Sequence, residues 1–436
     1  MRIANRTGRR EMLRSAFLSL AIVASAPVAA AVPAGLVGLP PETHDVRREY
    51  LETAVGPLSA IERFSDLRTP SFEAGRDVIV GAEEAAEYRY LFFVPEIDGE
   101  FPLFSAGTYI LRRRRNDGGL DQLKIFLRSD PGFFVRIWPD GEERSTLSLY
   151  LAGVELYRGV PLPVSLEVLL EEPFERIVDL TQGRIDWPIV FPETAHPGYR
   201  DVAVTADRAR SMLHTLPDAE DGAMDEEGNL VFIDSLVLQD QEPGFNCSGF
   251  AKWIVDGLFM GRYGRYLPIE PLKRKHLELR GHRWSEPLEE DRDPYFGLDW
   301  TRNLATAMLS AEQGGREVHP EAADVRTVPY HVYVEDIGFP VERLPQILYF
   351  LAVREPGHVY IASLNRAFGS DPPLNQHVHV AVFFPYFDEK GRFFVDVMER
   401  NVETSLESLD RRYHADHVHL VSVRADRSFA PPVIRN

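Results

Sequence analysis

The sequence contains a single cysteine, Cys247, among its 436 residues. One thiol cannot close an intramolecular disulfide, and it cannot supply the several cysteine ligands of a zinc site or an iron–sulfur cluster. A chain of this length buries a sizeable hydrophobic core without such covalent links. Cys247 is therefore either inert packing or a reactive group, and its surroundings decide between the two.

Basic residues are in the minority. Lys and Arg total 48 against 67 Asp and Glu, which gives a formal net charge of −19. Proteins that bind nucleic acid carry a basic footprint, so this balance argues against such a partner. One basic run, Arg112–Arg115, is typical of a solvated strand end, with binding of an anionic polymer as the alternative.

Several families of cofactor and metal motifs are also missing. We find no GxSxG element, phosphate-binding loop or dinucleotide glycine pattern, so no nucleotide cofactor is expected. His414, Asp416, His417 and His419 lie close together but lack a recognised ligand spacing such as HExxH. We therefore expect no cofactor and no metal.

Long apolar runs are absent as well. The run from Ala16 to Val23 is too short for a stable transmembrane anchor, and no later run is longer. Five arginines precede it, and Ala29–Ala31 follows as a small-residue cleavage site. This order predicts a signal peptide over residues 1–31 and export to the periplasm or beyond, and Arg9–Arg14 resembles a twin-arginine export signal. Its removal would leave a mature net charge near −23.

The mature chain divides into parts that differ in residue pattern and in the secondary structure that the pattern predicts. Residues 32–85 are typical of a helical and extended segment, and residues 86–200 of an all-β domain with a proline-rich linker. Aromatic and branched residues alternate with Asn, Asp and Gly turn clusters in this region, which indicates a β-sandwich or barrel. The expected strands are 88–94, 109–111, 123–127, 133–137, 147–156 and 164–170.

Residues 201–436 form the second expected domain, of the α+β class. Helices are predicted over 206–213, 250–259 and around 300–308. In the helix at 250–259, Lys252 and Asp256 are expected off the apolar face. Strands are predicted over 347–353, 358–364, 377–384, 393–398 and 417–423. Helices followed by an antiparallel sheet predict a sheet with helices packed against it.

Cys247 lies directly before the helix at 250–259. Asn246 is a good N-cap residue, which places Cys247 in the first helical turn. Unpaired amides and the helix dipole stabilise a thiolate there, and the same amides can receive an oxyanion. Gly249 leaves room near the sulfur for a substrate backbone. These features favour a nucleophile over a buried inert thiol.

A nucleophilic thiol needs a base and a polar group that orients the base. His379 opens an alternating strand, and a hairpin turning near Lys390 places it opposite Asn401, with Glu399 on the same face. A register change of one residue would substitute Asp396 for Glu399. We take His379 as the base and Glu399 as the orienting residue, with Asp396 and Asn401 as alternatives.

The segment Asn246–Phe250 and the Trp-containing helix after it resemble the Asp-Cys-Ser-Gly signature of NlpC-type cell-wall cysteine peptidases. The segment His379–Phe383 is similar to the His-Val-Gly-Ile-Tyr motif of that family. The resemblance implies a papain-like domain over 201–436, with Cys247 as nucleophile, His379 as base and a third polar residue on the next strand.

Three features depart from the NlpC pattern. Asn246 stands where the NlpC signature has Asp, and both residue types cap helices. The two catalytic positions are 132 residues apart, a separation that the general papain order permits but that requires an insertion over 260–345. His358–Ala362 also matches the histidine motif, with His377 or His379 then as third member.

The resemblance implies hydrolysis of an amide bond in a peptidoglycan stem peptide. Two enzymatic alternatives within the same fold are a thiol acyltransferase and a hydrolase of another amide or lipid. The non-enzymatic alternative is a cell-envelope binding protein.

Overall fold

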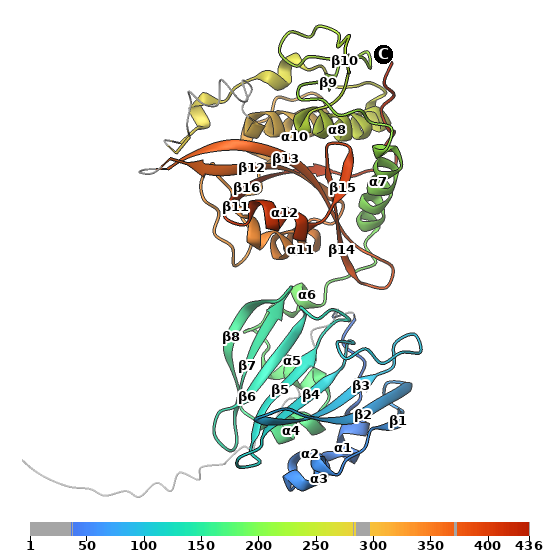
Figure 1. The fold of residues 1–436 in the computed structure, drawn as a ribbon, viewed down its shortest axis with the longest axis vertical. Coiled ribbons are helices and arrows are strands. Elements are labelled where there is room, and N and C mark those ends of the chain that lie inside the picture. The colour runs from blue at the N-terminus through green and yellow to red at the C-terminus, as the bar shows by residue number, and fades with distance from the viewer. Residues whose placement is uncertain (1–35, 37, 282, 285–296, 370–372, 436) are drawn as a thin grey trace, which may run out of the picture.

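The structure is a computed structural model, and it describes residues 36, 38–281, 283–284, 297–369 and 373–435. Two bodies follow one another along the chain, joined through the short helix α6 (Trp187–Val190) (Figure 1). The expected signal peptide lies outside the described residues. No helix within the described ranges is long and apolar enough to cross a membrane.

The N-terminal body is built on one eight-stranded antiparallel sheet whose strands follow in chain order from β1 to β8. Three short helices precede the sheet and two follow it. Their bounds are α1 (His44–Glu49), α2 (Leu51–Val55), α3 (Leu58–Glu62), β1 (Leu67–Ser71), β2 (Arg76–Glu84), β3 (Tyr88–Pro95), β4 (Tyr109–Arg114), β5 (Leu120–Phe126), β6 (Phe134–Pro139), β7 (Ser145–Leu151), β8 (Val154–Leu162), α4 (Leu166–Glu171) and α5 (Phe174–Leu180).

The strands alternate buried and half-buried side chains, as a sheet packed on one face requires. Leu111, Ile125 and Val135 are fully buried beside residues of α4 and α5. The sheet starts at Leu67, earlier than the strand-like texture indicated. It is one sheet with helices on one face rather than the two sheets of a sandwich, and among the described residues β1 and β8 do not pair.

One expected strand of this body, 164–170, is wrong. The structure has helix α4 there, because Ser165 caps it through a hydrogen bond from the Val168 amide. Leu166, Leu169 and Leu170 then share the spacing of one buried helix face.

The C-terminal body carries a six-stranded sheet of order β11-β16-β12-β13-β14-β15, with antiparallel pairings. Its elements, in chain order, are α7 (Pro197–Leu213), β9 (Ala223–Met224), β10 (Leu230–Val231), α8 (Cys247–Tyr263), the 3-10 turns η1 (Glu270–Lys273) and η2 (Leu277–Leu279), α10 (Gly297–Glu312), η3 (Pro320–Ala323), β11 (Phe339–Pro340), η4 (Val341–Arg343), α11 (Leu344–Arg354), β12 (His358–Phe368), β13 (Leu374–Phe387), β14 (Phe393–Glu399), β15 (Val402–Thr404), α12 (Leu406–Tyr413) and β16 (His417–Arg424).

Helices cover both faces of this sheet. α8 and α10 lie above it in Figure 1, and α11 and α12 lie below. Val380 and Val382 of β13 pack into the core shared with α8, whereas Ala381 and Phe383 pack into the core shared with α11. The α+β class and the helix-packed antiparallel sheet are therefore observed.

Two expectations about this body need correction. Residues 347–353 form helix α11 rather than a strand; they are buried all round, so they lack the polar face that marks a helix in sequence. Lys252 and Asp256, expected off the apolar face of α8, are both fully buried and pair with each other, Nζ to Oδ2, at 2.6 Å.

Candidate active site

Helix α8 begins at Cys247. Asn246 has extended backbone angles, and its side-chain oxygen accepts a hydrogen bond of 2.7 Å from the Gly249 amide. Because the first residues of a helix have no acceptor one turn earlier, helix geometry leaves the Cys247 and Ser248 amides unpaired within α8. The predicted N-cap and the position of the thiol in the first turn are confirmed.

The packing of the chain requires glycine at position 249. A Cβ at this position would lie 1.9 Å from the backbone oxygen of Gly222. The Asn246 amide also donates to that oxygen, at 3.1 Å. The space that the sequence assigned to a substrate backbone is therefore filled by the segment that leads into β9, and substrate must approach Cys247 from another direction.

His379 on β13 and Glu399 on β14 lie side by side. Nε2 of His379 is 2.6 Å from Oε2 of Glu399. The hairpin pairs Val382 with Met398, the register that a turn centred on Lys390 requires. Glu399 is only 4% exposed, so its carboxylate is held against the ring rather than solvated.

The imidazoles of His377 and His379 both act on the thiol of Cys247, through hydrogen bonding and charge that lower its pKa. The pairing of β12 with β13 explains why both are available. Leu364 faces His379 and Asn365 faces His377, so Val378 is an extra residue in a β-bulge. Bulges re-aim side chains next to active sites, and this one breaks the simple alternation of the strand.

Each imidazole is held by a different partner. Nδ1 of His377 lies 2.8 Å from Oγ of Ser363 on β12. Its ring packs on Gly297, at the start of α10, where a Cβ would come within 2.3 Å of the ring atoms. With Nε2 of His379 engaged by Glu399, Nδ1 of that ring is the nitrogen left for the sulfur.

This arrangement favours a thiolate and an imidazolium. Burial acts to raise the pKa of Cys247, but hydrogen bonds and charge from the two histidines outweigh it and lower the pKa to about 5. Burial acts to lower the pKa of His379, yet hydrogen bonds from its ring to Cys247 and Glu399 raise it to about 9. At neutral pH the pair is ionised and the sulfur is nucleophilic.

Helix α12 supports the pair from the other side of Glu399. Arg412 donates to Oε1 of Glu399, and the Tyr413 ring stacks on His379 with 6.0 Å between ring centroids. Burial acts to raise the pKa of Glu399, but hydrogen bonds from His379 and Arg412 lower it. Glu399 therefore stays ionised and favours the charged imidazole.

The other sequence candidates lie elsewhere. Asp396 faces Phe384 and pairs with Arg210 at 2.8 Å. The Asn401 side chain donates to the Leu216 carbonyl at 3.1 Å. His358 begins β12 six residues from Leu364, the partner of His379, which is about 20 Å along a strand.

The remaining histidines on β16 and before it do not form a metal site. His419 is fully buried, with Nε2 at 3.2 Å from Asp324, and Asp416 pairs with Arg366 at 2.7 Å. In the described part of the chain no cluster of three His, Cys, Asp or Glu residues has a ligand arrangement.

A cavity of about 420 Å³ adjoins the histidine and carboxylate of the candidate site. Asn401 and Arg412 line it together with His379 and Glu399. Its lining residues carry both signs of charge, which suits a substrate with amide and carboxylate groups.

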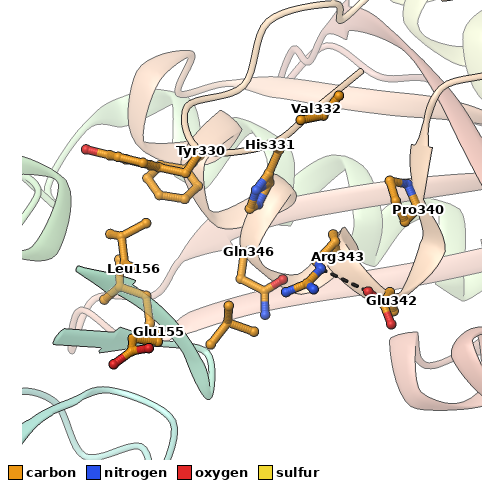
Figure 2. Close-up of a pocket in the computed structure, with 12 residues that line it drawn as sticks. Glu155, Leu156, Tyr330, His331, Val332, Pro340, Glu342, Arg343 and Gln346 are labelled. Carbon is orange, nitrogen blue, oxygen red and sulfur yellow. Dashed lines mark ion pairs between the residues drawn. The ribbon is translucent and has the colours of Figure 1, made fainter. Parts of the chain in front are cut away.

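A second cavity, of about 370 Å³, lies between the two bodies, and Figure 2 shows its lining. Leu156 of β8 and Gln346 of α11 face each other across it. It contains no thiol, so it is separate from the candidate active site.

Sequence reasoning missed the contact of His377 with the thiol and the support from Ser363, Arg412 and Tyr413. The sequence shows two histidines separated by one residue, at 377 and 379. Both can approach the sulfur only because Val378 forms a β-bulge. No local pattern marks Arg412 or Tyr413, because their role arises only when α12 packs beside β14.

Comparison with known families matches one part of the chain. A family described as a domain of unknown function (DUF8515) matches residues 40–189, which hold the eight-stranded sheet and helices α1–α5. The match stops before every residue of the candidate active site. No curated protein matches the chain. No solved structure matches it either.

Proposed function

We propose that this protein is an exported cysteine hydrolase that cleaves an amide bond. The observation that carries the proposal is a sole thiol at a helix start, beside a histidine whose Nε2 lies 2.6 Å from the Glu399 carboxylate, with the thiol pKa lowered to about 5 by two histidines. A pKa this low has no use in an inert packed cysteine, and it weighs against a purely binding role.

The reaction follows from the positions of the groups. The Cys247 thiolate attacks the carbonyl carbon, and the carbonyl electron pair moves onto oxygen. The oxyanion is received by the Cys247 and Ser248 amides, which have no acceptor within α8. As the C–N bond breaks, the His379 imidazolium gives its proton to the leaving amine, and a thioester remains.

Water then completes the cycle. Neutral His379 takes a proton from the attacking water, whose oxygen bonds to the thioester carbon while the C–S bond breaks. The products are a carboxylic acid and the regenerated thiolate and imidazolium. Glu399 keeps the imidazole in the tautomer and orientation that both steps need, and it stabilises the charged form.

The fold of residues 201–436 supports a papain-like assignment as part of the same proposal. A nucleophile helix packs on an antiparallel sheet that carries the histidine, as in the NlpC-type peptidases that the motifs resemble. That resemblance makes a peptidoglycan stem peptide the first substrate to test. Export through the segment at 1–31 would bring the enzyme to that substrate.

The test is digestion of purified muropeptides by the mature protein, followed by mass spectrometry of the products. We expect hydrolysis by the native chain and by His358→Gln, and none by Cys247→Ala. Thermal unfolding checks that each variant is folded. Undiminished cleavage by folded Cys247→Ala would overturn the proposal.

Acyl transfer begins with the same thioester, so the same assay separates the two outcomes. Added glycine amide would appear in the products of a transferase and would leave the products of a hydrolase unchanged. We expect the second result.

A further inference from the structure

The basic run Arg112–Arg115 of the N-terminal body is already neutralised. Arg112 pairs with Asp121 at 2.5 Å, and Arg115 pairs with Glu84 at 2.8 Å. Arg114 contacts Asp117 at 3.1 Å. Arg113 is buried and donates to backbone carbonyls, among them Ala54 O at 2.9 Å. Each of these four side chains therefore already has a partner within the N-terminal body.

Two other cations on the same sheet are not neutralised. Lys124 of β5 and Arg136 of β6 are direct cross-strand partners. Their side chains are half-buried on the face of the sheet opposite to the packed residues Ile125 and Val135. Among the described residues neither makes an ion pair with a carboxylate, and the buried Nε of Arg136 has no hydrogen-bond partner.

Aromatic rings hold these two cations in place. Nζ of Lys124 lies 3.9 Å from the ring centroid of Phe134 and 4.2 Å from that of Phe126. The Arg136 guanidinium lies 5.1 Å from Phe134 and 5.3 Å from Tyr150. A ring attracts a cation through its quadrupole but does not cancel its charge. Held by rings rather than carboxylates, both cations remain available to an anion.

The close placement of Lys124 and Arg136 destabilises the free protein. Like charges directly opposite each other across two strands are destabilising. Burial and the neighbouring Arg136 lower the pKa of Lys124, which shows the unfavourable environment for its charge. One acidic residue, Glu155, accepts a hydrogen bond from the Tyr150 hydroxyl at 3.1 Å, and its carboxylate pairs with Arg158 rather than with Lys124 or Arg136. A local rule broken in this way is typical of a functional site.

We propose that this face of the N-terminal sheet binds an acidic glycan through one of its carboxylates. Lys124 and Arg136 together receive the carboxylate, and the guanidinium offers its paired N–H donors. Trp138, two residues beyond Arg136 on β6, and Tyr150, opposite Phe134, present half-buried rings on the same face. Such rings bury the apolar C–H faces of the adjoining sugars.

The net negative charge of the protein favours an acidic glycan over polyanions of higher charge density. The protein as a whole carries −19, so it repels a double-stranded nucleic acid, which has about one phosphate charge per 1.7 Å of helix axis. A polymer with one carboxylate per sugar meets a smaller barrier, and stacking supplies affinity that does not depend on charge. This inference does not depend on the hydrolase proposal, because none of these residues belongs to the candidate active site.

The test is calorimetric titration of the full-length mature protein with soluble polygalacturonate, and with neutral dextran as control polymer. We expect binding of polygalacturonate and not of dextran. Lys124→Gln/Arg136→Gln should weaken it at least tenfold. The matched control, Arg112→Gln/Arg114→Gln, removes two cations of the same face that are already paired with carboxylates, and it should change binding less than twofold.

Several outcomes would overturn the proposal. They are absence of polygalacturonate binding by native protein, equal losses in the two double variants, or tighter binding of DNA or anionic vesicles at the same salt concentration. If Lys124→Gln/Arg136→Gln does not fold, the native protein is acetylated with and without polygalacturonate, and peptide mass spectrometry measures the labelling of Lys124. Polygalacturonate should protect Lys124 at least fivefold and leave Lys390 unprotected, and equal labelling of Lys124 with and without glycan refutes the site.

Discussion

Nε2 of His379 lies 2.6 Å from Oε2 of Glu399, and this contact joins two adjacent strands beside the sole thiol of the chain. The other oxygen of Glu399 is taken by Arg412. The carboxylate is thus fixed at both ends and cannot turn away from the imidazole. This explains why the pair favours a charged ring although both residues are mostly buried.

Replacing Glu399 by Gln should lower the pKa of His379. A hydrogen bond to a charged group contributes about 1.5–3 kcal/mol, which corresponds to roughly 1–2 pKa units. The upper limb of the pH profile of kcat/KM should therefore move from near 9 towards about 7–8. Asp396→Asn, on the same strand but paired with Arg210, should leave that limb in place. Equal shifts in both variants would contradict the assignment of Glu399.

The pH dependence of activity should be bell-shaped. As the pH falls through about 5, the Cys247 thiolate takes up a proton and the lower limb falls. As the pH rises through about 9, His379 loses the proton that it must give to the leaving amine, and the upper limb falls. A lower limb near 8 would show that the thiol is not activated.

Alkylation tests the thiol without any substrate. At pH 6 a thiol of pKa near 5 is mostly ionised, roughly 300-fold more than an ordinary cysteine. A thiolate of lower pKa is intrinsically less nucleophilic, by roughly 40-fold here, so the net gain is about tenfold. Iodoacetamide should therefore modify Cys247 about ten times faster than a model thiol at this pH. Equal rates would count against the thiolate.

Alanine variants of His379 and His377 should differ in how much kcat/KM they lose. His379→Ala removes the proton carrier and should reduce kcat/KM by more than about a thousandfold. His377→Ala removes one of the two imidazoles that lower the thiol pKa, so we expect a loss of about tenfold and a higher thiol pKa. His358 lies about 20 Å along β12 from the partner of His379, so His358→Ala should leave kcat/KM unchanged. Titrating alkylation rate against pH gives the thiol pKa of each variant, and a larger loss at 377 than at 379 would exchange their roles.

Gly249→Ala should destabilise the fold. Its Cβ would meet the Gly222 backbone oxygen at 1.9 Å, and backbone yields less readily than a side chain. Overpacking of this kind costs about 1–3 kcal/mol. Gly264, the cap at the other end of α8, has open space around it but a φ of +69°, so Ala there should cost about 1–2 kcal/mol through strain alone. Urea unfolding measures both, and a Gly249→Ala midpoint equal to that of the native protein would contradict the contact.

Local patterns predicted much of the C-terminal body. The helix at 250–259 and the strands at 358–364, 377–384, 393–398 and 417–423 lie within α8, β12, β13, β14 and β16. They carry strong periodicity or branched residues, which short windows capture. The failures, 164–170 and 347–353, are apolar segments buried by other parts of the chain, and for such segments periodicity cannot separate a helix from a strand.

The sequence by itself determined that one thiol exists and that a capping residue precedes it, and it predicted that His379 and Glu399 lie on the same face of a hairpin. These are local properties: a cap needs one residue, and hairpin register follows from the position of its turn. Tertiary structure decided that a bulge brings His377 to the same sulfur, that Gly222 fills the space at Gly249, and that Arg412 fixes Glu399. Each of these depends on segments distant in sequence packing together, and no short pattern encodes such packing.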